Sequence, residues 1–220
     1  MRPFLAALAL FLATGPTAMA ATDDMPPHEV LATAQVDGTA VELRRYAPVI
    51  VAEVTVEAPS RDAASSMGFR PLADYIFGNN RPQARIAMTA PVTTVPATDG
   101  ERGQRIAMTA PVTTAADGAG AYVVRFRMPP EWTMDTLPEP LDPAVRLVEL
   151  PARDMAVVRF TGPRDRDAVA AAQTILDAYV AGTALSPAGP FVVTGYDGPR
   201  VPSARRRWEV QRPVAGAPSP

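Results

Sequence analysis

Cysteine and lysine are both absent from this chain of 220 residues, and histidine occurs once. Without cysteine the chain has no disulfide framework, no thiolate metal site and no thioether-linked prosthetic group. Packing alone therefore has to stabilise the fold. The single histidine, His28, excludes ligation of a metal by two histidines of the same chain.

Long apolar runs are also scarce, and the first one stands at the start of the chain. Arg2 precedes the apolar run 4–13, and Ala18, Met19 and Ala20 form a small-residue cleavage site. This order is typical of an export signal, and a run of about ten residues is short beside the roughly 20 that span a bilayer. We therefore expect a signal peptide over residues 1–20, no later transmembrane segment, and a periplasmic or secreted protein.

The charges of the mature chain nearly balance. Once Arg2 is removed, 20 arginines stand against 23 acidic residues. Such a balance lacks the basic surface that nucleic-acid-binding proteins use. We expect no nucleic acid among the partners, and the 200 mature residues suffice for one domain with a core of its own.

Alternating apolar residues predict strands over residues 41–45 and 49–57, with Ala47 and Pro48 as the bend of a hairpin. Residues 62–77 carry apolar side chains at helical spacing and stop at Gly78. Pro71 lies within this segment, so the helix either kinks there or begins there.

One internal repeat follows. Residues 85–94 and 105–114 are the same ten residues, RIAMTAPVTT. In an extended conformation the Ile, the Met, the second Ala and the Val of each copy share one side, so we expect Met88 and Met108 in the core. The prolines of both copies favour an edge strand or a bulge.

The second part of the chain predicts more strands and one clear helix. Strands are expected over residues 122–128, 145–150, 155–161, 191–196 and 206–210, with a proline-rich loop over 129–143 and a helix over 165–181. The order strand, helix, strand, strand therefore occurs twice. This order predicts two similar halves, from Val49 through the repeat and from Met155 to Val210, which pack sheet to sheet and leave a ligand groove between helix and sheet at their junction.

Seven short segments make the sequence more specific. They are residues 42–46 (ELRRY) with 51–54 (VAEV), 68–72 (GFRPL) with 75–76 (YI) and 78–80 (GNN), 86–92 (IAMTAPV), 124–126 (VRF) with 128–129 (MP), 137–140 (LPEP), 160–162 (FTG) and 194–197 (TGYD). Together they resemble the SOUL heme-binding family from about Val30 to Arg212.

The resemblance implies an α+β fold, in which a distorted antiparallel β-barrel of two strand-helix-strand-strand halves is flanked by two helices and related to small-molecule-binding domains of the GyrI type. It also implies non-covalent binding of heme or another tetrapyrrole along the first helix. Carried over by position, the cleft comprises Phe69, Leu72, Ala73 and Ile76, with the basic residues Arg200, Arg205 and Arg206 near the propionates.

The expected domain organisation is a signal peptide 1–20, a flexible segment 21–39, a SOUL-like domain 40–212 and a disordered tail 213–220. His28 does not fall within a family motif, so we expect heme to bind without a strong axial ligand. We expect a monomer that carries, scavenges or buffers heme and is not an enzyme.

Three alternatives stay open. Leu72 and Ile76 can instead belong to the core, with Arg205 to Arg207 as a solvated face. The fold can instead serve as a binding module for another small hydrophobic molecule. Less favoured is a GyrI-like small-molecule hydrolase using Glu53 or Tyr75, since the sequence contains no nucleophile elbow, zinc motif or phosphate loop.

Overall fold

The computed structural model describes residues 9–11, 25–82, 103–107, 112–116, 121–198 and 200–217. Its elements are β1 (Ala9–Phe11), β2 (His28–Val36), β3 (Thr39–Tyr46), β4 (Val49–Glu57), α1 (Arg61–Ile76), β5 (Asn80–Arg81), β6 (Val112–Ala116), β7 (Ala121–Arg127), β8 (Glu139–Pro140), β9 (Arg146–Leu150), β10 (Arg153–Thr161), α2 (Arg166–Ala181), β11 (Ser186–Pro187), β12 (Val192–Gly195), the 3₁₀ turn η1 (Ser203–Arg205) and β13 (Arg207–Ala215).

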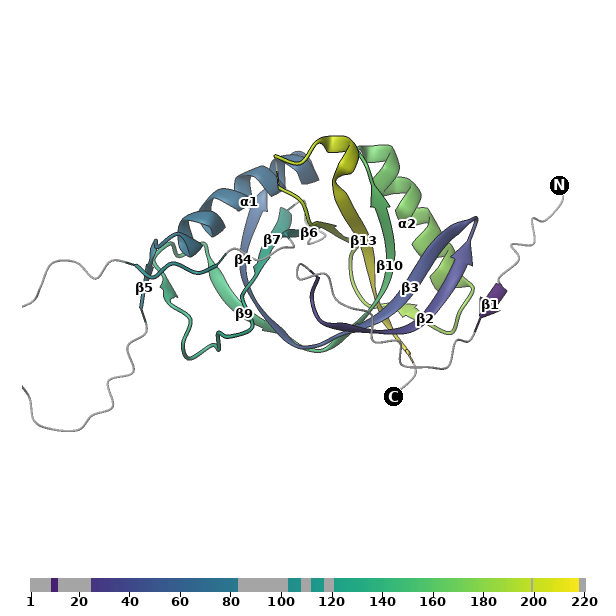
Figure 1. Ribbon diagram of the computed structural model, residues 1–220, viewed down its shortest axis with the longest axis horizontal. Helices are drawn as coiled ribbons and strands as arrows, with labels where there is room; N and C mark the ends of the chain where they lie inside the picture. The colour runs from purple at the N-terminus through teal and green to yellow at the C-terminus, as the bar shows by residue number, and fades with distance from the viewer. Residues whose placement is uncertain are drawn as a thin grey trace, which may run out of the picture.

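The strands form one curled antiparallel sheet. Their order is β1-β2-β3-β10-β13-β12-β6-β7-β4-β9, with β11 also paired to β13, while β5 and β8 form a separate pair. The sheet curls into a half-barrel, and Figure 1 shows α1 over one half and α2 over the other. The expected α+β fold, a distorted antiparallel barrel with two flanking helices, is confirmed.

Two strand-helix-strand-strand halves are present, but they join edge to edge in one sheet and do not pack sheet to sheet. The first is β4-α1-β6-β7 and the second is β10-α2-β12-β13. The last strand of the first half is β7, which follows the repeat. In each half the long first strand pairs with the last strand, and the last pairs with the middle one. The middle strands β6 and β12 pair with each other and so join the halves. β4 and β10 also have the same order of buried and exposed residues along their lengths.

The predicted hairpin between residues 41–45 and 49–57 is wrong. β3 pairs with β2 and β10, whereas β4 pairs with β7 and β9. A residue before proline favours extended backbone and Pro48 fixes its own φ near −65°, so the chain bends at Ala47–Pro48 without reversing. The bend instead lets one continuous stretch serve both halves, with Tyr46 opposite Arg153 and Val49 opposite Leu150.

Both ends of the ordered domain extend further than expected. The segment 21–39 was expected to be flexible, yet residues 28–36 form β2, whose inward residues Ala34 and Val36 are buried. The tail expected from residue 213 begins later, because β13 continues to Ala215 beside β10 and β11. β1 falls within the expected signal peptide and pairs with β2.

Helix α1 begins at its N-cap Ser60, whose hydroxyl accepts a hydrogen bond from the Ala63 amide at 3.2 Å. Pro71 therefore lies inside the helix and does not begin it. The inward face of α1 packs on β4 and β7 in a core that contains Leu72, Ile76 and Phe126. Ile106 from the second repeat copy joins this core, and its amide donates to the Ile76 carbonyl oxygen at 2.8 Å.

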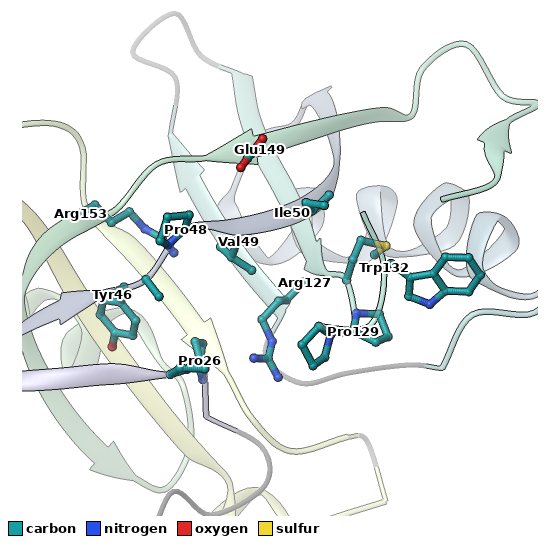
Figure 2. Close-up of a pocket in the computed structure, with 14 residues that line it drawn as sticks. Pro26, Tyr46, Pro48, Val49, Ile50, Arg127, Pro129, Trp132, Glu149 and Arg153 are labelled. Carbon is teal, nitrogen blue, oxygen red and sulfur yellow. The ribbon is translucent and has the colours of Figure 1, made fainter. Parts of the chain in front are cut away.

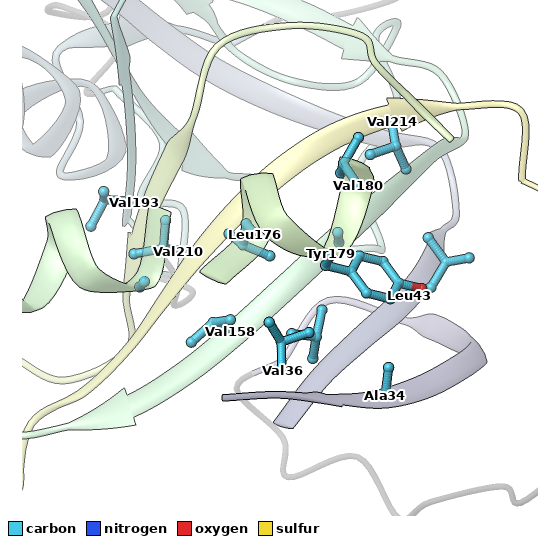
Figure 3. Packing of buried hydrophobic residues seen from close by; sticks show 13 residues of the cluster. Ala34, Val36, Leu43, Val158, Leu176, Tyr179, Val180, Val193, Val210 and Val214 are labelled. Carbon is cyan, nitrogen blue, oxygen red and sulfur yellow. The ribbon is translucent and has the colours of Figure 1, made fainter. Parts of the chain in front are cut away.

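Helix α2 covers the other half. Asp165 caps its first turn, accepting from the Ala168 amide at 2.8 Å. The helix predicted over residues 165–181 is confirmed, and its buried residues Ala172, Leu176 and Tyr179 pack on the valines of β3, β10 and β13 (Figure 3). The first repeat copy, together with Met88 and Met108, lies outside the described residues.

Gly68 brings α1 close to the sheet, and its replacement by alanine is expected to destabilise the protein. A Cβ at this position would lie 2.6 Å from Cγ2 of Val124 and 3.1 Å from Cγ1 of Val54. Helix propensity alone favours alanine by about 1 kcal/mol, whereas overpacking costs about 1–3 kcal/mol. Urea unfolding of Gly68→Ala should therefore show a net loss, and Ser66→Ala on the exposed side should not. A more stable Gly68→Ala variant would disprove the close approach.

Candidate functional site

The structure separates the four residues expected to contact a ligand on the first helix. Leu72 and Ile76 are fully buried and Ala73 nearly so. Leu72 and Ile76 therefore belong to the core, which was the alternative interpretation, and they offer no surface to a ligand. Only Phe69 is exposed, and its ring meets that of Phe126 edge-on at 5.2 Å.

The outward side of α1 nonetheless exposes large apolar side chains. Met67 is 52% exposed, Phe69 40% and Phe77, at the helix C-cap, 55%. Phe69, Ala73 and Phe77 follow one another at four-residue spacing, so they form one stripe along the helix. We call Phe69, Ala73 and Phe77 the α1 stripe. Sequence reasoning missed Phe77, although its spacing from Phe69 would have found it.

The three expected arginines lie in the loop between β12 and β13. Arg200 and Arg205 are exposed, and Arg206 is half-buried with its Nε donating to the Val201 carbonyl oxygen at 2.8 Å. This loop passes between the ends of the two helices in Figure 1. The three arginines therefore stand on a different element from Phe69 and Ala73, which lie on α1.

His28 stands at the start of β2, on the other side of the sheet from α2. Its Nδ1 lies 2.8 Å from the Pro26 carbonyl oxygen, and its ring packs beside that of Tyr46 at 5.2 Å. In the part of the chain that the structure describes, no group of three or more His, Asp or Glu residues could hold a metal ion.

A cavity of about 270 Å³ lies at the Ala47–Pro48 bend. Its walls are mostly apolar, with five prolines, Trp132, Val49 and Ile50 among them. A smaller hollow of about 70 Å³ adjoins it, extends over the uncovered face of the sheet and shares Pro26, Val49, Arg127 and Arg153 with it. Ligand pockets typically span about 300–1,000 Å³, so this cavity suits a small ligand or one edge of a larger one.

Arg127 and Arg153 line both hollows. Arg127 ends β7 and Arg153 begins β10, and Figure 2 shows them entering from opposite sides. Burial lowers the pKa of both guanidinium groups, and the nearby Arg125 lowers that of Arg153 further. Burial in apolar surroundings thus disfavours the charged form of each arginine. Sequence reasoning missed both residues.

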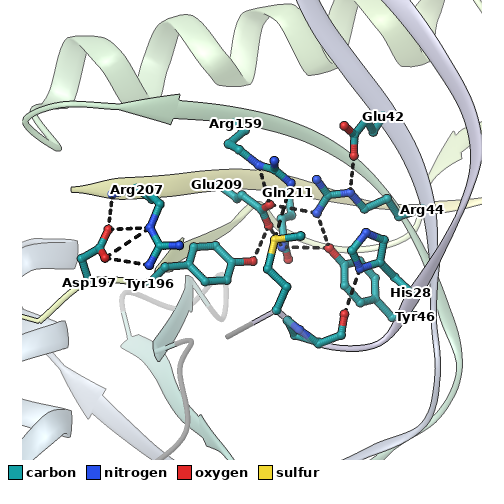
Figure 4. Close-up of polar contacts among 12 residues, drawn as sticks. His28, Glu42, Arg44, Tyr46, Arg159, Tyr196, Asp197, Arg207, Glu209 and Gln211 are labelled. Atoms are coloured by element: carbon teal, nitrogen blue, oxygen red, sulfur yellow. Dashed lines mark hydrogen bonds and ion pairs between the residues drawn. The ribbon is translucent and has the colours of Figure 1, made fainter. Parts of the chain in front are cut away.

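A buried polar network lies on the same face of the sheet (Figure 4). Its centre is Glu209, which is fully buried and accepts hydrogen bonds from Arg44 at 2.8 Å, the Tyr196 hydroxyl at 2.6 Å and Gln211 at 2.8 Å. Burial pushes the pKa of Glu209 upward, but the Arg44 charge and these hydrogen bonds hold it below its usual value. Glu209 is therefore held ionised.

The two residues considered for acid-base chemistry do not meet. Glu53 lies on the uncovered face, paired with Arg125 at 2.8 Å and Arg146 at 2.7 Å. Tyr75 lies on the buried face of α1 with its hydroxyl donating to the Pro138 carbonyl oxygen, and burial raises its pKa. The sheet separates them, so they cannot act as one acid-base pair.

Among the described residues no helix is long and apolar enough to cross a membrane.

Comparison with known proteins agrees with this architecture. The C-terminal domain of EcmrR matches the fold with a TM-score of 0.56 at 15% identity, over 79% of this chain and 96% of that one. A conserved protein from Listeria innocua matches with a TM-score of 0.52 at 11% identity, over 79% and 92%. These structural neighbours are GyrI-like, and at such identities they show the fold alone.

Sequence comparison identifies the family. Human heme-binding protein 2 is 42% identical over 53 residues, which are 24% of this chain and 26% of that protein. The family model described as SOUL heme-binding protein matches residues 23–104 and 97–213, and each match contains one copy of the repeat. Because these two matches span most of the chain, it belongs to the SOUL heme-binding protein family.

Proposed function

We propose that this protein is exported and binds heme or another tetrapyrrole non-covalently on the outward side of α1. Membership of the SOUL family supports the ligand class. The α1 stripe supports the place, since it contains two of the six exposed large apolar side chains among the described residues, Phe69 and Phe77, and a third, Met67, stands on the same helix. Such clustering on one helix marks an interaction site more often than scattered apolar residues do.

The α1 stripe suits a flat apolar ligand. Covering apolar surface gains about 25 cal/mol per Å², and both phenylalanine rings of the stripe stand at the helix surface. Arg70 is exposed on the same side of α1 between Phe69 and Phe77, so it can meet a propionate there. Arg200, Arg205 and Arg206 would have to reach the ligand from their loop.

Ligation of the heme iron is expected to contribute little to binding. The chain has no cysteine, and the packing of His28 against Tyr46 and Pro26 places it away from α1. Binding therefore rests on apolar contact and on the propionates. A monomeric carrier, scavenger or buffer without catalytic activity fits such a surface, and the predicted signal peptide supports a periplasmic or secreted location.

A hemin titration of the chain that starts at Ala21, followed by Soret absorbance, tests the proposal. We expect saturable one-to-one binding that weakens about tenfold or more in Phe69→Ala/Phe77→Ala, because the stripe loses most of its apolar area. His28→Ala should bind as the unchanged protein does. Arg205→Ala/Arg206→Ala should weaken binding only if that loop reaches the ligand.

The matched control is Val30→Ala, which removes an exposed apolar side chain (39% exposed) on β2, in the half of the sheet that α2 covers. It should leave hemin binding unchanged. Absence of saturable hemin binding would favour the second function, a module for another small hydrophobic molecule, which the apolar cavity at the Ala47–Pro48 bend supports.

A further inference from the structure

The cavity at the Ala47–Pro48 bend contains a cation whose hydrogen bonding is incomplete. Nη1 of Arg153 is buried and makes no hydrogen bond to any described residue. The guanidinium lies over the Tyr46 ring at 5.5 Å. A buried donor without an acceptor is costly, and native proteins keep few of them. A ligand that supplies an acceptor would remove this cost.

Two other arginines on this face of the sheet each have a carboxylate partner. Arg44 meets Glu209 at 2.8 Å, and Arg125 meets Glu53 at 2.8 Å. The sheet thus provides a carboxylate for each of these guanidinium groups. For Arg153 the described residues provide an aromatic face and no carboxylate.

The charge around the cavity is positive. Arg127 is a second cation in the wall, and Arg125 lies close enough to lower the pKa of Arg153. Glu149, the one carboxylate among the residues that line this cavity, is exposed and lies apart from both arginines in Figure 2. An anion entering the cavity therefore meets two half-buried positive groups between apolar walls.

We propose that this cavity binds the carboxylate of a ligand whose remaining surface is apolar, with Arg153 as the group that holds the carboxylate. The forked donors of a guanidinium match a carboxylate in geometry, and such charge-assisted hydrogen bonds are strong in apolar surroundings. Trp132, Pro48 and Pro129 form walls against which an alkyl or aryl group packs. This site is separate from the α1 stripe, because the core beneath α1 lies between them.

The carboxylate has two possible sources. One is a free aryl or alkyl acid small enough for about 270 Å³. The other is the propionate edge of a larger ring such as a tetrapyrrole, with the rest of the ring outside the cavity. Both present the same group to Arg153, so the experiment has to distinguish them.

Acid and ester pairs test the proposal with the chain that starts at Ala21. Calorimetry compares 2-naphthylacetic acid with its methyl ester, and fluorescence titration compares protoporphyrin IX with its dimethyl ester. We expect at least one acid to bind about 10- to 100-fold more tightly than its ester, as a charged hydrogen bond provides. Arg153→Met should abolish this preference, and Arg153→Lys should keep part of it.

Arg159→Met is the matched control, since Arg159 stands on the same strand and outside the cavity; it should keep the preference. Equal affinities for acid and ester in the unchanged protein, or an undiminished preference in Arg153→Met, would overturn the proposal. If circular dichroism shows that Arg153→Met does not fold, the acid-to-ester ratios of the unchanged protein and of Arg153→Lys decide. Loss of hemin binding together with preserved naphthylacetic acid binding would refute the proposed function and leave this site standing.

Discussion

Replacing Arg44 with methionine is expected to lower the free energy of unfolding by about 3–5 kcal/mol. Arg44 is 1% exposed and its partner Glu209 is 0% exposed. The two groups meet at 2.8 Å in the middle of the sheet, and Arg44 also donates to the Tyr46 hydroxyl at 2.9 Å. Removing the cation leaves a buried carboxylate without its main counter-charge, which costs far more than an exposed ion pair contributes. Urea unfolding at pH 7 measures the loss.

Two control variants test whether the loss of stability comes from burial of the ion pair or from the contact alone. Arg159 approaches the same Oε1 atom of Glu209 at 3.3 Å but is 46% exposed. Arg159→Met should therefore cost less than about 1 kcal/mol. The double variant Arg44→Met/Glu209→Met should recover most of the loss, because an apolar pair leaves no buried charge. Equal losses for Arg44→Met and Arg159→Met would show that burial does not set the cost.

The pH dependence of the Arg44→Met loss has a definite sign. Burial opposes ionisation of Glu209, but the Arg44 charge and three hydrogen bonds still hold the pKa of Glu209 below its usual value. The ionised Glu209 therefore stabilises the fold above the unfolded pKa of about 4.3, and this contribution disappears as the pH falls through the folded pKa. Without Arg44, burial dominates and raises the pKa of Glu209. The two proteins should therefore converge in stability between pH 7 and pH 4. A gap that widens toward acid would contradict this account.

Strand and helix positions were predictable where one side of the element is strongly apolar. The valine-rich segment from Val49 to Glu57 gave β4 its observed limits. β2 was missed because its inward residues include alanines, which carry too little apolar contrast to mark a strand. β3 and β4 were each predicted correctly, but their pairing was not. Pairing depends on partners about 100 residues away, such as Arg153 opposite Tyr46.

The candidate site was less predictable than the fold for the same reason. The family resemblance directed attention to α1, but the rotation of that helix turns Leu72 and Ile76 inward and leaves Phe77 outside. The cavity is formed by a bend, a terminal segment and two arginines from different halves of the chain. No motif links Arg127 to Arg153, since only the folded sheet brings β7 and β10 to one hollow.

The repeat allows a matched pair of deletions with a large expected difference. Removing residues 83–102 or residues 85–104 leaves chains of equal length that both keep one complete RIAMTAPVTT segment. The two products differ at two positions only. The first keeps Gly103 and Gln104 before that segment, and the second has Gln83 and Ala84 there instead.

Gly103 is the residue that should decide the outcome. A Cβ at position 103 would lie only 1.6 Å from the Gly78 carbonyl oxygen, so glutamine cannot occupy this place without moving the backbone. Alanine in place of Gln104 keeps the contacts of that position, because Asn80 binds only the backbone of residue 104, through its Oδ1 and Nδ2 at 2.8 Å. Any cost of the tighter turn at Arg81–Pro82 is common to both deletions.

We therefore expect the deletion of 83–102 to be more stable than the deletion of 85–104 by on the order of 3 kcal/mol, the upper range of overpacking costs. Urea unfolding of the two proteins measures the difference, and Gly103→Gln in the full chain should reproduce most of the loss. Ile106→Ala is the reference for a core defect, expected to cost about 2–5 kcal/mol, since Ile106 is 3% exposed. Equal stability of the two deletions would mean that the shortened chain does not place residue 103 against Gly78.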